Sequence, residues 1–145
     1  MPGYKEHMII GMIFVFGFLL FNYAFGWFNI AYTLENMAVL MVVSLFYSLL
    51  PDYDISSSKI SAVITLICVF GIIFSFMFGE TLLGIFLAVV LLVPHIFKHR
   101  GFLHSIMAGV LLSLPMWLIA GMGVFLCCFI AYFSHLLADG EIKLI

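Results

Sequence analysis

The chain has 145 residues, of which 66% are hydrophobic and 8% are charged, and its formal net charge is -2. Water-soluble domains carry about 25% charged residues, so a chain this apolar cannot cover its surface for water. Lipid is therefore the expected solvent for most side chains. With five Lys and Arg residues in all, no basic surface is available to follow a phosphate backbone, and nucleic-acid binding is not expected.

The apolar runs predict an all-α, polytopic integral membrane helical bundle of about six transmembrane helices in a single domain, residues 1–145. Helix-breaking residues divide the runs at Pro51, at Gly79 and at Gly121. Pro115 is able to kink the fifth helix or move its end. No signal-peptide cleavage site is evident, so the first span is expected to be retained. The expected spans are roughly 8–28, 34–50, 60–78, 81–97, 103–120 and 123–139.

Basic residues set the expected orientation of these spans. With six crossings, all of them fall on the side that holds both termini: Lys5, Lys59, Lys98, Arg100 and Lys143. Lys and Arg in short loops stay in the cytoplasm, so a multi-pass protein of the cytoplasmic membrane with cytoplasmic N- and C-termini is predicted. The opposite side has tight turns with Glu35 and Glu80, expected to be solvated.

The same topology places all histidines and aspartates at or near the cytoplasmic ends of spans, at four separate junctions. Imidazole and carboxylate groups are the usual ligands of zinc and related divalent ions. One interfacial His or Asp alone is more often a solvated cap than a ligand, so the prediction depends on their convergence. His95 is either a fifth imidazole of the site or an interfacial residue one helical turn below His99, and the second reading is preferred. The predicted metal ligands are His7, Asp52, Asp54, His99, His104, His135 and Asp139.

Two spacings favour convergence. His135 and Asp139 stand four residues apart, so on a helix they share one face and can hold the same ion. Pro51 ends the second span, and an extended stretch after it would point Asp52 and Asp54 to the same side. Two carboxylates on one side suit two neighbouring cations.

The loop before the fifth span adds a third group of polar residues. His99 and His104 would diverge on a continuous helix, but Gly101 between them permits a turn that brings both imidazoles inward. Arg100 offers a planar fork of donors for phosphate or carboxylate oxygens. By contrast, the Ser56–Ser58 run is read as a flexible loop and helix cap, and Cys68, Cys127 and Cys128 as packing residues.

At these residues the chain resembles the YdjM-like family of membrane-bound, metal-dependent hydrolases. The family commonly has Thr where this chain has Leu103. The pattern is also distantly similar to the superfamily of zinc-dependent phospholipase C and single-strand nucleases, whose helical sites bind three zinc ions; this likeness implies phosphoester hydrolysis. The resemblance rests on His7 with Gly11, LPDYD at 50–54, HRGFLHS at 99–105 and SHLLAD at 134–139.

The first functional hypothesis is therefore a metal-dependent phosphoester hydrolase acting on a lipid, a lipid-linked substrate or a soluble phosphodiester at the cytoplasmic leaflet. The seven ligands would share one to three ions, zinc being expected, which activate water for attack on phosphorus. Arg100 and Lys59 would stabilise the developing negative charge.

Two alternatives belong to other classes. A metal or ion transporter would place ionisable groups near mid-membrane, whereas here they lie at span ends. A non-enzymatic scaffold with a structural metal would use four ligands, fewer than the seven candidates.

Overall fold

The structure is a computed structural model that describes residues 3–55, 57–96, 101–140 and 142–144, with only the backbone of 93–96. Within these ranges the chain is helical, and the one β-type contact is an isolated parallel bridge between Ser105 and Lys143. The expected all-α fold is confirmed. The helices are α1 (Tyr4–Phe25), α2 (Leu34–Leu49), α3 (Lys59–Phe78), α4 (Thr81–Ile96), α5 (Ile106–Ala120) and α6 (Met122–Ala138), with 3-10 turns η1 (Leu50–Asp54) and η2 (Phe102–His104).

The helices have the length and surface of a membrane bundle. Among the described residues, three segments are long and apolar enough to cross a membrane: Tyr4–Phe25, Leu34–Asp54 and Lys59–Phe78. Three shorter apolar helices follow. Large apolar side chains are exposed on the helix surfaces, as at Leu82 (84%) and Leu118 (82%). Such surfaces suit lipid rather than water.

The chain divides into two compact units. The first consists of Met1–Pro51 with His104–Ile145, and the second of Asp52–Leu103. Two compact units can belong to one membrane domain, so the prediction of a single domain stays a prediction. The second unit is the α3–α4 hairpin, in which Gly71 lets α3 approach Leu87 of α4.

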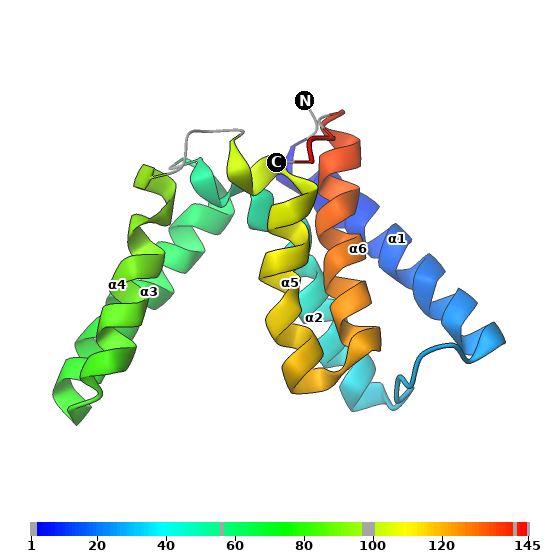
Figure 1. The fold of residues 1–145 in the computed structure, drawn as a ribbon, viewed down its shortest axis with the longest axis horizontal. Helices are drawn as coiled ribbons and strands as arrows, with labels where there is room; N and C mark the ends of the chain where they lie inside the picture. Colours follow the sequence, from blue (N-terminus) through cyan, green and yellow to red (C-terminus); the bar gives the residue numbers. More distant parts are fainter. Residues whose placement is uncertain (1–2, 56, 97–100, 141, 145) are drawn as a thin grey trace. The chain divides into compact units, whose positions relative to one another are not determined.

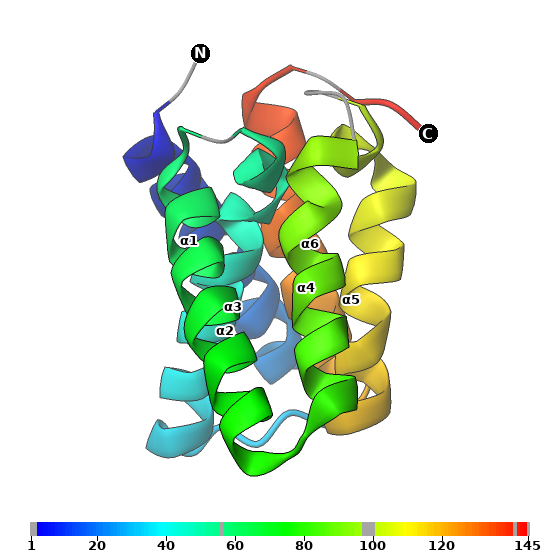
Figure 2. The same ribbon diagram turned by 90° about the vertical axis from the view of Figure 1, so that its left-hand side faces the viewer.

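Helix α6 is the central helix of the first unit and packs against α1, α2 and α5. Its inward face is fully buried, with Cys127, Ala131, Tyr132 and Leu136 at 0% exposure. Cys128 is buried beside them, so both cysteines pack in the core as expected. In this unit the first turn of α1, the start of α5 and the last turn of α6 lie at one end (Figures 1 and 2).

The predicted helix breaks are confirmed at two glycines. Gly79 ends α3 and Gly121 separates α5 from α6, both with positive φ, a conformation that glycine adopts without strain. Ser58 caps α3 by accepting a hydrogen bond from the Ser61 N–H, as expected for the serine run. Pro115 lies inside α5, which continues to Ala120.

Three helix boundaries differ from the predicted spans by a few residues. Helix α1 begins at Tyr4 rather than near 8. Helix α1 ends at Phe25 rather than near 28, because Gly26 turns left-handed and the Asn22 side chain holds the following loop through hydrogen bonds to Phe28 and to the Tyr32 hydroxyl. Helix α5 begins at Ile106 rather than 103, because Ser105 is its N-cap.

Candidate metal centre

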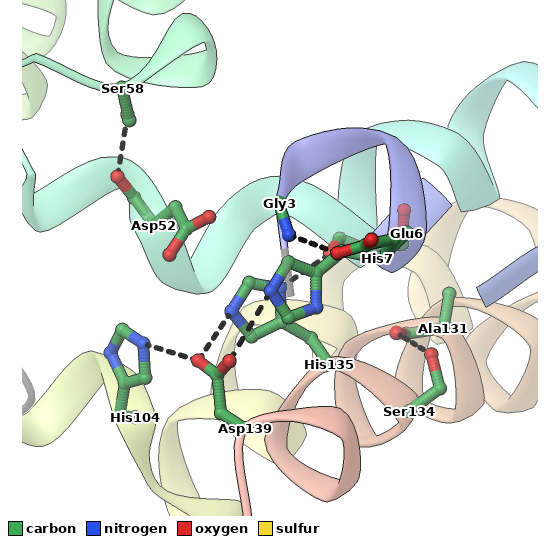
Figure 3. A network of polar contacts seen from close by, with 11 residues as sticks. Gly3, Glu6, His7, Asp52, Ser58, His104, Ala131, Ser134, His135 and Asp139 are labelled. Atoms are coloured by element: carbon green, nitrogen blue, oxygen red, sulfur yellow. Dashed lines mark hydrogen bonds and ion pairs between the residues drawn. The ribbon is translucent and has the colours of Figure 1, made fainter. Parts of the chain in front are cut away.

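Four of the predicted ligands meet at one end of the first unit (Figure 3). They come from three places in the chain: the beginning of α1, the turn before α5 and the end of α6. His7, His104 and His135 are almost fully buried, and the Asp139 side chain is 7% exposed. The structure therefore brings these four side chains together, and their role as metal ligands stays a prediction.

The Asp139 carboxylate is the centre of the group. Its Oδ1 lies 3.3 Å from Nε2 of His7, while its Oδ2 lies 3.4 Å from Nε2 of His135 and 3.8 Å from Nε2 of His104. The two carboxylate oxygens thus face different imidazoles. The carboxylate can give both oxygens to one ion or one oxygen to each of two neighbouring ions.

The imidazole rings are packed against one another. The His7 and His135 rings are stacked, with centroids 3.8 Å apart and planes 15° apart. The His104 ring meets the His135 ring edge-on, with centroids 5.6 Å apart. This packing restricts rotation of the rings, and restricted ligands bind an ion at lower entropic cost.

The orientation of His135 is set by a backbone carbonyl. Its Nδ1 lies 2.8 Å from the carbonyl oxygen of Ser48, which can only accept, so Nδ1 carries the proton. In the neutral ring, Nε2 then presents a lone pair toward Asp139. This is the usual arrangement of a metal-bound histidine, whose other nitrogen donates to a carbonyl or carboxylate.

The local sequence makes that carbonyl available. Ser48 lies in the last turn of α2, where the final carbonyls lack intrahelical partners. Pro51 follows and has no N–H to donate to the preceding turn. The carbonyl that holds His135 therefore lies at the end of the second span, three residues before Pro51.

The position of Asp139 is electrostatically unusual. It is the C-cap of α6, and its N–H donates to the carbonyl of His135. Helix C-termini carry partial negative charge and disfavour a carboxylate by about 0.3–1 kcal/mol. A cation held between Asp139 and the imidazoles would offset this repulsion.

The turn that carries His104 is fixed on its C-terminal side. The Ser105 hydroxyl accepts from the Ala108 N–H, and the first N–H groups of α5 donate to the C-terminal segment: Ile106 to the Lys143 carbonyl at 2.9 Å, and Met107 to the Leu144 carbonyl at 3.2 Å. Free donors at a helix start need such partners when they are buried. The C-terminal residues thus stabilise the turn beside the site.

The distances suit a tetrahedral ion. Donor atoms about 2.0–2.1 Å from zinc lie roughly 3.4 Å apart at tetrahedral angles. The contacts of Asp139 with His7 and His135 are close to this value, and one ligand atom each of His104, His135 and Asp139 lies within 4.8 Å of the others. The first unit alone therefore offers donors that fit a divalent metal.

The other predicted site residues lie elsewhere. Asp52 and Asp54 are in η1, and Lys59 begins α3 with an exposed side chain; all three belong to the second unit. Asp54 is 7% exposed, and the backbone carbonyl of Asp52 accepts from the Ser58 hydroxyl. Their part in the site stays a prediction. His99 and Arg100 lie outside the described residues, as does the side chain of His95.

Sequence reasoning missed Ser48, whose carbonyl orients His135, because its role comes from the backbone and not from its residue type. The available signal was indirect: a position three residues before a proline, in the last turn of an apolar helix. No side-chain pattern identifies such an acceptor.

These observations define a class: an α-helical membrane protein with a buried His/Asp cluster that suits a divalent metal. The chain belongs to the YdjM inner membrane protein family, whose sequence model matches residues 1–141. The predicted resemblance is confirmed, and with it the location in a membrane. No curated protein and no solved structure matches the chain. The distant similarity to zinc-dependent phospholipase C stays a prediction.

Proposed function

We propose that this protein is a membrane-bound, metal-dependent hydrolase that cleaves phosphoester bonds in a lipid or lipid-linked substrate at the cytoplasmic leaflet. The proposal includes a multi-pass topology with cytoplasmic termini and zinc as the expected ion. One observation carries it: a buried carboxylate, Asp139, lies 3.3–3.8 Å from Nε2 of three histidines.

The tautomer of His135 supports a cation in this position. The Nδ1–H of His135 donates a hydrogen bond to the Ser48 carbonyl, so in the neutral ring Nε2 is an acceptor. This acceptor lies 3.4 Å from the Asp139 carboxylate, whose oxygen is also an acceptor. Two acceptors at this distance repel unless a proton on Nε2 or a cation lies between them. A divalent ion would be such a cation, and when bound it would provide Lewis-acid activation of water and of a phosphoryl oxygen.

The protein's own residues have separate roles in this proposal. His7, His104, His135 and Asp139 would hold the ion or ions, with their side chains restricted by the packing of the rings. Asp52, Asp54 and His99 are proposed as further ligands from the sequence pattern alone. Arg100 and Lys59 bind the phosphoryl oxygens and stabilise the negative charge that develops there.

The position of the cluster favours hydrolysis over transport. His7 is in the first turns of α1 and Asp139 follows the last turn of α6, so the ligands lie at helix ends. Transporters hold their ions near the bilayer midplane, where helices are broken. The alternative of a structural metal in a non-enzymatic scaffold is separated from hydrolysis by the following test.

The test measures metal and turnover on the same preparation. Detergent-purified protein is analysed by metal mass spectrometry and assayed with a panel of phospholipids and a generic phosphodiester. We expect at least one equivalent of zinc or a similar ion, loss of hydrolysis on chelation and recovery on adding the ion back. A His135→Ala preparation is the control, because a contaminating hydrolase would copurify with it unchanged.

The outcomes discriminate the hypotheses. Metal that is present while no substrate in a wide panel is cleaved would favour the structural scaffold. Hydrolysis that survives complete removal of metal would contradict the proposed mechanism.

A further inference from the structure

We infer that Gly11 is a positioning residue for the metal ligands: its missing side chain lets α1 approach α2 and α6 closely enough for His7 to reach Asp139. This inference rests on the metal binding in the proposed function and not on the reaction. Gly11 is buried on α1, four residues after His7, so the two positions share one helix face.

The space at Gly11 is closed by one neighbour in particular. A Cβ placed there would lie 2.6 Å from Cβ of Ser48 and 3.3 Å from its Oγ, and 3.4 Å from Oγ of Ser134. Only the contact with the Ser48 Cβ is shorter than side chains tolerate. Glycine is thus required at this point by the approach of α2.

The partners of Gly11 are themselves small residues whose hydroxyls are satisfied within their own helices. Ser48 donates to the Leu45 carbonyl at 2.8 Å, and Ser134 donates to the Ala131 carbonyl at 2.7 Å, each within its own helix. Small residues of this kind allow close approach of helix backbones in membranes. Three helices therefore meet closely one turn away from the His7 ring.

Each of the three helices carries a part of the site close to the Gly11 contact. Helix α1 carries His7, α6 carries His135 directly after Ser134, and α2 carries the Ser48 carbonyl that orients His135. Restoring an ordinary contact of about 3.5 Å at Gly11 would require a shift of about 1 Å. Whichever helix moved, a ligand or its support would be displaced.

The size of that displacement is large for a metal site. Moving α1 by about 1 Å would change the His7–Asp139 contact, 3.3 Å in the structure, by up to about 1 Å, whereas two ligands of one tetrahedral ion lie roughly 3.4 Å apart. Functional groups have to be held within about 0.5 Å of their working geometry. We therefore expect Gly11→Ala to weaken metal binding by at least about tenfold, as for loss of a supporting residue around metal ligands.

The matched control is Gly17 on the same helix. A Cβ at Gly17 meets nothing within 4 Å. Glycine to alanine also improves helix propensity equally at both positions, by about 1 kcal/mol. Gly17→Ala is therefore expected to bind metal like the wild type, so that any difference between the two variants comes from the contact with Ser48.

The experiment compares four variants of the full chain: Gly11→Ala, Gly17→Ala, Ser48→Gly and the double variant Gly11→Ala/Ser48→Gly. The probes are zinc affinity by chelator competition and the visible spectrum of the Co²⁺-loaded protein, which reports ligand geometry. Ser48→Gly removes the clashing Cβ and keeps the carbonyl that holds His135. We expect the double variant to recover the affinity and the spectrum that Gly11→Ala loses.

The results separate this inference from the proposed function. A wild type without metal would overturn the proposed function. A wild type that binds metal, with Gly11→Ala unchanged in affinity and spectrum, would overturn only the role of Gly11. If Gly11→Ala is not recovered folded, the double variant decides: folding with wild-type affinity supports the inference, and folding without metal while Ser48→Gly binds normally contradicts it.

Discussion

Replacing Asp139 by Asn tests whether its carboxylate is a metal ligand or a structural partner of the histidines. The substitution keeps the size of the side chain and removes its charge, together with one of the two oxygens that face the imidazoles. If Asp139 is a metal ligand, the substitution should lower zinc affinity without destabilising the metal-free protein. If Asp139 is a structural ion-pair partner, the substitution should destabilise the metal-free protein.

The expected loss of affinity follows from the ligand count. Binding of zinc to a four-ligand site is worth about 10–16 kcal/mol, which is about 3 kcal/mol per ligand, or about two powers of ten in Kd. An amide oxygen ligates weakly, so Asp139→Asn should raise the Kd about 100-fold.

The stability of the metal-free protein should change in the other direction. Asp139 is the C-cap of α6, where its charge costs about 0.3–1 kcal/mol. Removing the charge should leave the metal-free melting temperature unchanged or raise it by up to about 3 °C in a chain of this length. If Asp139 instead stabilised the fold by pairing with the histidines, the melting temperature would fall.

The assay combines chelator competition for zinc with thermal unfolding in detergent, with and without metal. Glu35→Gln is the matched control, because it makes the same carboxylate-to-amide change at an exposed position on α2. Unchanged zinc affinity in Asp139→Asn, or a metal-free melting temperature several degrees below wild type, would refute the ligand assignment.

Three further predictions concern other parts of the chain. Arg100→Ala should retain metal while hydrolysis falls by about 100-fold or more, as when one oxyanion donor is removed; loss of metal would show that Arg100 supports the fold instead. Reporters fused at residue 145 should be cytoplasmic and one inserted at 79–80 should not, and the reverse result would contradict the six-span orientation. Asn22→Ala should lower the free energy of unfolding by about 1–3 kcal/mol, because the loop after α1 loses its hydrogen bonds to Phe28 and Tyr32, while zinc affinity stays constant.

Helix breaks were predictable where a single residue decides them. Pro51, Gly79 and Gly121 interrupt the apolar runs by local backbone chemistry, and the structure ends or separates helices at these points. The end of α1 was predicted less well. Its position depends on the Asn22 side chain reaching Phe28 and Tyr32 across the loop, and this tertiary contact leaves no periodic signal.

The site, like the fold, was predictable where local geometry decides it and less so where tertiary packing does. His135 and Asp139 share a helix face by their spacing alone, so their contact followed from helix geometry. Predicting the stacking of His7 on His135 would have required the distance between α1 and α6. We infer that this distance depends on the packing of Gly11. Predicting the role of the Ser48 carbonyl would have required knowing which backbone carbonyls at the end of α2 accept hydrogen bonds from other helices.

The division of the first unit into two distant parts of the chain has a consequence for biosynthesis. His7 and Asp139 lie at opposite ends of the sequence, and translation at about 5–20 residues per second separates their synthesis by roughly 7 to 26 s. During this interval α1 is already made, but the carboxylate that His7 contacts does not exist. Under the proposed function, an ion would meet this set of ligands only after α6 is complete, and a nascent chain arrested before Asp139 would carry His7, His104 and His135 without the carboxylate that they contact.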